Sequence, residues 1–329
     1  MTRSAALQAW LADTCGIPPQ PLQAASSDAS FRRYYRVLTV AGPRIVMDAP
    51  PPQENCRAFV AVDGLLRGAG LHAPEIHAAD LEQGFLLLED LGPRTYLQAL
   101  ADQPADPLYR AALTALCRLQ GIAARDQVPV FDAAFMRREV ELLPEWYLER
   151  HLGRPLDADA RQVWERCTGA LIEGCLQQGQ VLMHRDFHCR NLMDCADGPG
   201  ILDFQDAVWG PVSYDPASLL RDAYVDFEED QQIDWLVRWW EQARKAGLPV
   251  KADFGEMYRD FEWMGLQRHL KIVGIFCRLH HRDGKPDYLA CLPRVLAHIQ
   301  RSAERYAELR GLSRLLADAQ GTLDQGLSF

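Results

Sequence analysis

The feature that most constrains this chain is a pair of short apolar segments, each followed at once by acidic or amide side chains. The first segment, residues 181–183, precedes Asp186 and Asn191, and the second, residues 200–202, precedes Asp203. Short apolar runs bounded by polar and glycine–proline turns predict buried strands. The sequence therefore predicts a strand, a polar loop and two further strands, with carboxylate and amide groups where the strands end.

The pattern His-x-Asp-x-x-x-x-Asn with a later Asp-Phe supplies the parts that phosphoryl transfer from ATP to an alcohol requires. Asp186 is predicted to be the catalytic group that accepts the proton of the acceptor hydroxyl. Asn191 and Asp203 are the predicted Mg²⁺ ligands, because Mg²⁺ prefers hard oxygen donors. His184 and His188 are expected to organise the loop.

Composition and charge exclude several other classes of protein. The 329 residues are 48% hydrophobic and 24% charged, which is typical of a folded globular chain. The formal net charge of -10 disfavours nucleic acid and membrane as partners, since both need clustered Lys and Arg. Neither a secretory signal nor a membrane-spanning run is evident, so a cytoplasmic protein is expected. Nine cysteines without a Cys-x-x-Cys pair predict reduced thiols.

The predicted secondary structure changes after Gly92 from mainly strands to mainly helices. Strand patterns predict a hairpin at residues 31–48 and a strand pair at about residues 75–89, with a helix at residues 54–67 between them. The later segments with helical periodicity are residues 107–124, 133–151, 157–178, 215–226, 229–246, 253–281 and 288–318. Two lobes are therefore predicted. Residues 1–92 form a nucleotide-binding lobe with a hinge at about residues 89–92, and residues 93–329 form a helical lobe with the catalytic loop and the acceptor site.

Residues 184–191 together with Asp203 resemble the aminoglycoside phosphotransferase and choline kinase family. The resemblance implies an α+β, bilobal protein-kinase-like fold with a small β-rich N-lobe and a larger, mainly helical C-lobe. It also implies ATP and Mg²⁺ as cofactors, and nucleotide contacts from Glu89 and Leu91 in the hinge.

Two longer segments, residues 203–222 and 266–285, are similar more narrowly to the anomeric N-acetylmuramate and N-acetylglucosamine kinases of bacterial cell-wall (peptidoglycan) recycling. This resemblance implies transfer of phosphate to the anomeric hydroxyl of the sugar, giving the sugar 1-phosphate. An aminoglycoside kinase or a kinase of choline and other aminoalcohols is the alternative.

One departure from the family pattern concerns the lysine that usually contacts nucleotide phosphates from the third strand, where this chain has Met47. All four lysines follow residue 244. We expect Arg32 or Arg33 to supply the charge, because strand alternation directs Arg44 to the face opposite Met47. Glu54 is expected either to orient this arginine or only to favour its helix dipole. Two alternatives remain. Either Arg32 and Arg33 are only solvated side chains of a hairpin, or the chain is a nucleotide sensor without catalytic activity.

Charged side chains near the motif are the candidate substrate contacts. The lactyl carboxylate of N-acetylmuramate requires a cation, for which the candidates are Arg190, Arg268, His269 and Lys271. Sugar hydroxyls, or the ammonium groups of an aminoglycoside, require acceptors, for which the candidates are Asp206, Asp215 and Asp222. Of these candidates, Arg190, Asp206, Arg268 and His269 are the predicted substrate contacts.

Overall fold

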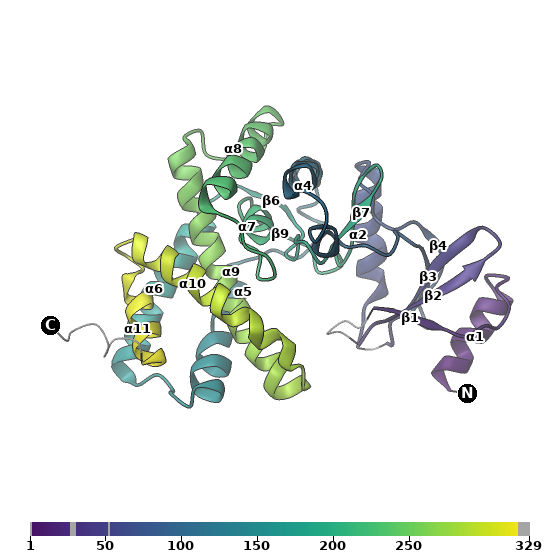
Figure 1. Cartoon of the computed structure of the whole chain (residues 1–329), viewed down its shortest axis with the longest axis horizontal. Helices are drawn as coiled ribbons and strands as arrows, with labels where there is room; N and C mark the ends of the chain where they lie inside the picture. The colour runs from purple at the N-terminus through teal and green to yellow at the C-terminus, as the bar shows by residue number, and fades with distance from the viewer. Residues whose placement is uncertain (1, 27–30, 52, 322–329) are drawn as a thin grey trace. The chain divides into compact units, whose positions relative to one another are not determined.

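The computed structural model describes residues 2–26, 31–51 and 53–321, and Figure 1 labels its helices and strands where there is room. The described chain forms two compact units. Unit 1 comprises Met1–Leu108 and Arg190–Asp206, and unit 2 comprises Tyr109–Cys189 and Ala207–Phe329. The lobe boundary predicted at residue 92 therefore differs from this division, since unit 1 also takes residues 93–108 and the hairpin segment that follows the catalytic loop.

Unit 1 is built on an antiparallel five-stranded sheet in the order β1-β2-β3-β5-β4. Its strands are β1 (Gln23–Ser26), β2 (Arg33–Thr39), β3 (Gly42–Asp48), β4 (Ile76–Asp80) and β5 (Phe85–Glu89). Its helices are α1 (Arg3–Asp13), α2 (Cys56–Gly68) and α3 (Tyr96–Ala99). The alternation seen in the sequence sets the register, in which Met47 of β3 lies opposite Tyr34 and Leu86.

The core of unit 1 lies between α1 and the sheet. Leu7, Trp10 and Leu11 recur at helical spacing on one face of α1, and they pack with Val46 and Phe85 of the strands. The ring centroids of Trp10 and Phe85 are 5.7 Å apart. This packing fixes the sheet on which the nucleotide-binding candidates are carried.

A second, two-stranded sheet in unit 1 consists of β7 (Leu192–Cys195) and β8 (Gly198–Ile201). The backbone of this hairpin is bonded to the rest of the unit at two points. The amide of Asp194 donates to the carbonyl of Arg94 at 2.9 Å, and the amide of Ile201 donates to the carbonyl of His72 at 2.8 Å. These bonds place the segment that carries Asn191 and Asp203 in unit 1.

Unit 2 is mainly helical. Its helices are α4 (Ala105–Gln120), which begins in unit 1, α5 (Ala133–Val140), the π-helix η1 (Leu143–His151), α6 (Ala158–Leu176), α7 (Tyr214–Leu220), α8 (Glu229–Lys245), α9 (Phe254–Asp283), the 3₁₀ helix η2 (Pro286–Cys291), α10 (Leu292–Arg305) and α11 (Arg310–Gln320). Its strands are β6 (Gln180–Met183) and β9 (Val208–Pro211), which pair antiparallel.

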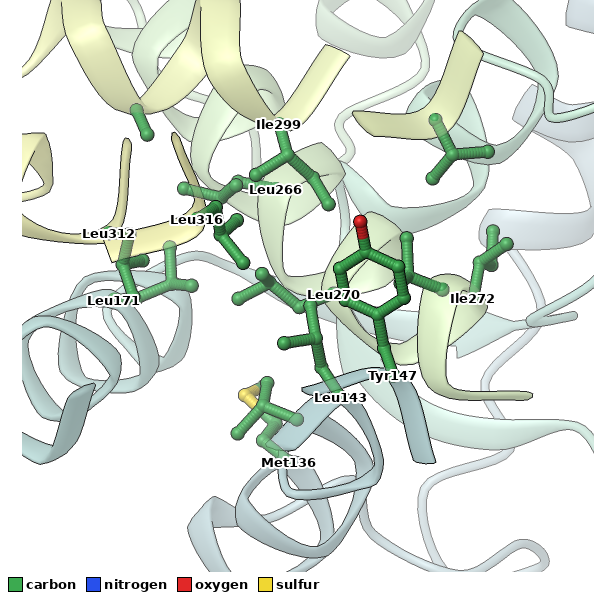
Figure 2. Packing of buried hydrophobic residues seen from close by; sticks show 14 of the residues in the cluster. Met136, Leu143, Tyr147, Leu171, Leu266, Leu270, Ile272, Ile299, Leu312 and Leu316 are labelled. Atoms are coloured by element: carbon green, nitrogen blue, oxygen red, sulfur yellow. The ribbon is translucent and has the colours of Figure 1, made fainter. Parts of the chain in front are cut away.

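The core of unit 2 surrounds α9, whose apolar side chains pack with those of the neighbouring helices. Figure 2 shows part of this core, in which Leu266 and Leu270 of α9 lie among side chains such as Leu143, Ile299 and Leu316. All five of these side chains are at most 2% exposed. A core of this kind holds α9 rigidly, which matters below because α9 carries charged residues in its middle.

Two of the long helices predicted from periodicity are interrupted. Residues 133–151 divide into α5 and η1, with Pro144 at the start of the second helix, where a missing backbone N–H is tolerated. Residues 288–318 divide into η2, α10 and α11. The chain is extended at Tyr306, with φ -113° and ψ 125°, and the Tyr306 hydroxyl donates to Glu262 at 2.5 Å. This bond to a buried carboxylate is a tertiary contact that periodicity cannot predict.

All nine cysteines are free thiols, as expected. Across the described ranges of the chain, none of the helices combines the length and the apolar character needed to cross a bilayer.

Candidate active site

The loop after β6 is held by a buried carboxylate that the sequence did not assign to this task. Asp215 in α7 is fully buried, and its two oxygens accept from the backbone amides of His184, at 2.7 Å, and Arg185, at 2.9 Å. Arg185 has φ 78°, a left-handed conformation that is costly for a non-glycine residue. Asp215 therefore fixes the backbone just before Asp186, and both of its oxygens are bonded to the loop rather than left for the hydroxyl or ammonium groups of a substrate.

A second buried carboxylate holds the other end of the loop. Asp222, 1% exposed, accepts from the backbone amide of Cys189 at 3.1 Å and from that of Tyr224 at 3.0 Å. The alternative role of Asp222 in substrate binding is thus replaced by a scaffolding one. Both carboxylates were predicted as polar candidates, but their partners in the catalytic loop could not be assigned, because the amides of His184 and Cys189 lie about 30 residues away in the chain.

Between these two attachments lies Asp186, whose side chain is 37% exposed. Burial alone would raise the pKa of this carboxyl, but the charges of Lys271, His188, Arg268 and Arg185 outweigh burial and hold its pKa well below the usual range. One of these cations is Arg268, whose Nη2 lies 3.7 Å from Asp186 Oδ1. Asp186 is therefore an ionised, partly accessible carboxylate on a rigid loop.

The two predicted organiser histidines belong to the same loop. His184 is buried, and its Nδ1 accepts the backbone amide of Asp186 at 3.3 Å. His188 is also buried, with its ring edge-on to Tyr224 at 5.5 Å between centroids. Burial lowers the pKa of His188 to about 4. Both placements agree with a supporting position beside Asp186.

The carboxylate of Glu139 in α5 forms ion pairs with two cations, Arg185 and Lys271. Its Oε1 lies 2.6 Å from Arg185 Nη2 and 3.4 Å from Lys271 Nζ, and its Oε2 accepts from Gln267 at 3.1 Å. Burial opposes the charged form, but Lys271 and Arg185 outweigh it and lower the pKa of Glu139. Glu139 was not among the predicted site residues. The sequence shows it only as an acidic residue within a predicted helix.

In unit 1, Asp203 and Asn191 are brought together by the β7–β8 hairpin. The amide of Leu202 donates to the carbonyl of Asn191 at 2.9 Å, and Asn191 Nδ2 lies 3.4 Å from Asp203 Oδ2. Asp203 has φ 61°, so its backbone is left-handed like that of Arg185. The next residue, Phe204, is fully buried and contacts Phe59 of α2 at 4.7 Å between centroids, which fixes the direction of the segment.

Arg32 lies beside three acidic side chains in unit 1, one of which is Asp203. Its Nε is 3.0 Å from Glu54 Oε2, while Nη1 is 3.9 Å from Asp203 and Nη2 is 4.0 Å from Asp206. Burial would lower the pKa of Arg32, but the surrounding acidic groups raise it, so the guanidinium stays charged. The neighbouring Arg33 is exposed, and Met47, where the family has lysine, is buried. Of the two predicted arginines, Arg32 is the one placed beside Glu54.

The donor set of Asp203 and Asn191 fits a divalent cation of the magnesium type. Within residues 2–26, 31–51 and 53–321, no group of three or more His, Cys, Asp or Glu is arranged to hold a metal by itself. Mg²⁺ needs no such cage, since it is commonly bound by one or two protein oxygens together with water and substrate phosphates.

The predicted hinge residues lie at the end of β5 and just beyond it. Glu89 accepts from the amide of Glu75 at 3.1 Å and lies 3.3 Å from His72 Nε2. The carbonyl of Leu91 accepts from the thiol of Cys195 at 3.4 Å. Sequence analysis missed Arg36, which bonds both oxygens of Asp90, at 2.5 and 3.0 Å, and so stiffens this segment.

The four predicted substrate contacts do not lie in one unit. Arg190 and Asp206 are exposed residues of unit 1, whereas Arg268 and His269 are buried residues of α9 in unit 2. His269 Nε2 lies 2.9 Å from the carbonyl of Arg221, and its ring stacks on His298 at 5.0 Å. Of these four residues, Arg268 forms an ion pair with Asp186.

Residues 21–254 match the profile of the phosphotransferase enzyme family. The chain belongs to this family. It is 49% identical to the N-acetylmuramate/N-acetylglucosamine kinase of Pseudomonas putida, over 92% of this chain and 90% of that protein. It is 42% identical to the protein of the same name from Neisseria meningitidis, over the full length of both.

Solved structures agree with the fold. The choline kinase LicA from Streptococcus pneumoniae matches with a TM-score of 0.65 at 12% identity, over 91% of this chain and 99% of that one. The ADP-bound aminoglycoside phosphotransferase APH(2'')-Ib matches with a TM-score of 0.59 at 15% identity, over 90% and 97%. The predicted family, phosphotransferase class and α+β protein-kinase-like fold are confirmed.

Proposed function

We propose that this chain transfers the γ-phosphoryl group of ATP to the anomeric hydroxyl of N-acetylmuramate, N-acetylglucosamine or both. The observation that carries the proposal is the 42% identity over the whole of both chains with a kinase named for these two sugars. The half-exposed Asp186, held between two buried carboxylates, is the group that this reaction requires at its acceptor oxygen.

In this reaction the anomeric oxygen forms a bond to the γ-phosphorus, the bond from that phosphorus to the β–γ bridging oxygen breaks, and ADP leaves. The hydroxyl proton passes to Asp186. A carboxylate with a lowered pKa is a weak base, so Asp186 contributes mainly by orienting the hydroxyl. The anomeric hydroxyl is more acidic than an ordinary alcohol, which makes a weak base sufficient.

On the nucleotide side, Asp203 and Asn191 would hold Mg²⁺, which neutralises charge on the phosphates when bound. Arg32, oriented by Glu54 at 3.0 Å, would contact the phosphates in place of the missing lysine. Its planar guanidinium can bind two phosphate oxygens at once. The hinge segment at Glu89 and Leu91 would receive the base of the nucleotide.

The positive charges around Asp186 disfavour the alternative function, which is phosphorylation of an aminoglycoside or an aminoalcohol. Arg268 lies 3.7 Å from this carboxylate, and Lys271 and Arg185 also lower its pKa. A cationic acceptor would be repelled there, whereas a neutral or anionic sugar would not.

The test is a measurement of ADP release with ATP and Mg²⁺ and one acceptor at a time, namely N-acetylmuramate, N-acetylglucosamine, kanamycin or choline. The expected result is turnover of at least one sugar, with ³¹P NMR placing the phosphate on the anomeric carbon. Turnover of kanamycin or choline without either sugar would overturn the proposal, and nucleotide binding without any turnover would indicate a sensor.

A further inference from the structure

The middle of α9 carries a buried arginine whose hydrogen-bonding capacity is largely unused. The Arg268 side chain is 3% exposed, and its one ion pair in the described part of the chain is the 3.7 Å contact with Asp186. Its Nε and Nη1 are buried and have no hydrogen-bond acceptor among the described residues. A buried guanidinium in this state is costly to the fold, and such groups call for a functional explanation.

The other cations near Asp186 have partners of their own. Arg185 and Lys271 share the carboxylate of Glu139, at 2.6 and 3.4 Å, and Lys271 also contacts the Tyr214 hydroxyl at 3.2 Å. Arg268 is thus the cation of unit 2 that is both adjacent to Asp186 and incompletely bonded. Its position on a helix packed on all sides means that the guanidinium is fixed before any ligand binds.

This inference rests on the proposed function. N-Acetylmuramate differs from N-acetylglucosamine by a lactyl ether on O3, which ends in a carboxylate. With the anomeric hydroxyl on Asp186, the O3 substituent lies about one ring width away, which is within reach of the guanidinium beside that carboxylate. We propose that Arg268 binds the lactyl carboxylate and so gives the chain a preference for N-acetylmuramate over its neutral relative.

A carboxylate on Arg268 would also withdraw part of that positive charge from Asp186. Arg268 is one of the charges that keep the pKa of Asp186 low, so its neutralisation would make Asp186 a better proton acceptor. N-Acetylmuramate would therefore be bound more tightly and phosphorylated faster than N-acetylglucosamine.

The test compares N-acetylmuramate with its lactyl amide, which keeps every atom of the sugar but removes the charge. For the wild-type chain, the ratio of kcat/KM for the acid to that for the amide is expected to be roughly 10-fold to 100-fold, as for a hydrogen-bonded charge pair. In Arg268→Met this ratio is expected to fall to near one. Any effect of the substitution on Asp186 or on folding is shared by the two substrates and cancels in the ratio.

Arg259→Met is the matched control, because Arg259 lies on the same helix in an exposed ion pair with Glu308. It is expected to keep the wild-type ratio. A wild-type ratio near one, or an unchanged ratio in Arg268→Met, would overturn the inference while leaving the sugar kinase in place. If Arg268→Met does not fold, the wild-type ratio still decides. Absence of phosphate transfer to any of these sugars would instead overturn the proposed function itself.

Discussion

Asp186 in unit 2 and Asp203 in unit 1 are both carboxylates that follow short buried strands, but their surroundings differ. The loop of Asp186 is bonded through backbone amides to two fully buried carboxylates, and the pKa of Asp186 is lowered by Lys271 and Arg268 of α9 and by Arg185 of the loop. Asp203 is similarly exposed, at 32%, with Arg32 Nη1 at 3.9 Å, and Asp206 beside it is 64% exposed.

Under the proposed function, this difference matches the separate parts of the reaction that the two units would serve. The group that orients the acceptor must be rigid, because small displacements of a reacting atom reduce the rate steeply. Groups that bind Mg²⁺ and phosphates can stay more open, since these ligands bring charges and coordination preferences of their own. Four predictions test this contrast.

The largest effect is expected for Asp186→Asn, which keeps the shape of the side chain but removes the proton acceptor. We expect kcat to fall roughly 10²-fold to 10⁴-fold, the usual contribution of a positioned base. Steady-state kinetics with the preferred sugar measure it. Asp234→Asn, at an exposed helix ion pair, is the control and is expected to leave kcat unchanged. A near-normal rate for Asp186→Asn would remove Asp186 from its role.

The second prediction concerns the stability of the loop. Asp215→Ala and Asp222→Ala each leave two backbone amides without their acceptor, so each is expected to lower the free energy of unfolding by about 2–4 kcal/mol. Asp206→Ala, at an exposed position of unit 1, is expected to change it by no more than about 0.5 kcal/mol. Chemical denaturation measures all three. Equal effects at the three positions would remove the contrast between the units.

The third prediction compares the two arginines at the start of β2. Arg32→Met is expected to weaken ATP binding roughly 10-fold to 100-fold, because a charged hydrogen bond to phosphate is lost. Arg33→Met, at the exposed neighbouring position, is expected to have little effect. Calorimetric titration with ATP and Mg²⁺ gives both dissociation constants. The reverse order would assign the phosphate contact to Arg33.

The smallest effect is a pH dependence at His188. Burial lowers its pKa to about 4, so its contribution to stability is present above its unfolded pKa of 6.5 and is lost as the pH falls from there toward 4. Between pH 7.5 and 5.5, the wild-type chain is expected to lose about 1 kcal/mol more stability than His188→Gln. Denaturation at the two pH values measures this difference, with the exposed His77→Gln as control. An equal loss in wild type and His188→Gln would show that His188 is protonated as easily in the folded chain as in the unfolded one.

Much of the fold was predictable because local patterns agree with tertiary contacts. In unit 1, β4 alternates between half-buried and exposed residues and β5 is a continuous buried run, α1 and α2 have apolar faces, and the motif residues follow apolar strands. The prediction failed where a distant contact decides the local structure. One helix was expected over residues 288–318. The backbone is extended at Tyr306 instead, and the Tyr306 hydroxyl donates to Glu262 of another helix.

The candidate site divides in the same way. The sequence by itself determined the family, the reaction class and the motif residues, because these depend on side-chain chemistry at fixed spacing. It also showed that the expected lysine is absent from the first lobe, from which an arginine was predicted to take its place. Only the tertiary structure placed Arg32 rather than Arg33 beside Glu54, assigned Asp215 and Asp222 to backbone amides, and put Arg268 beside Asp186. The physical reason is that a side chain's partner and burial depend on segments far away in the sequence, whereas its chemical type does not.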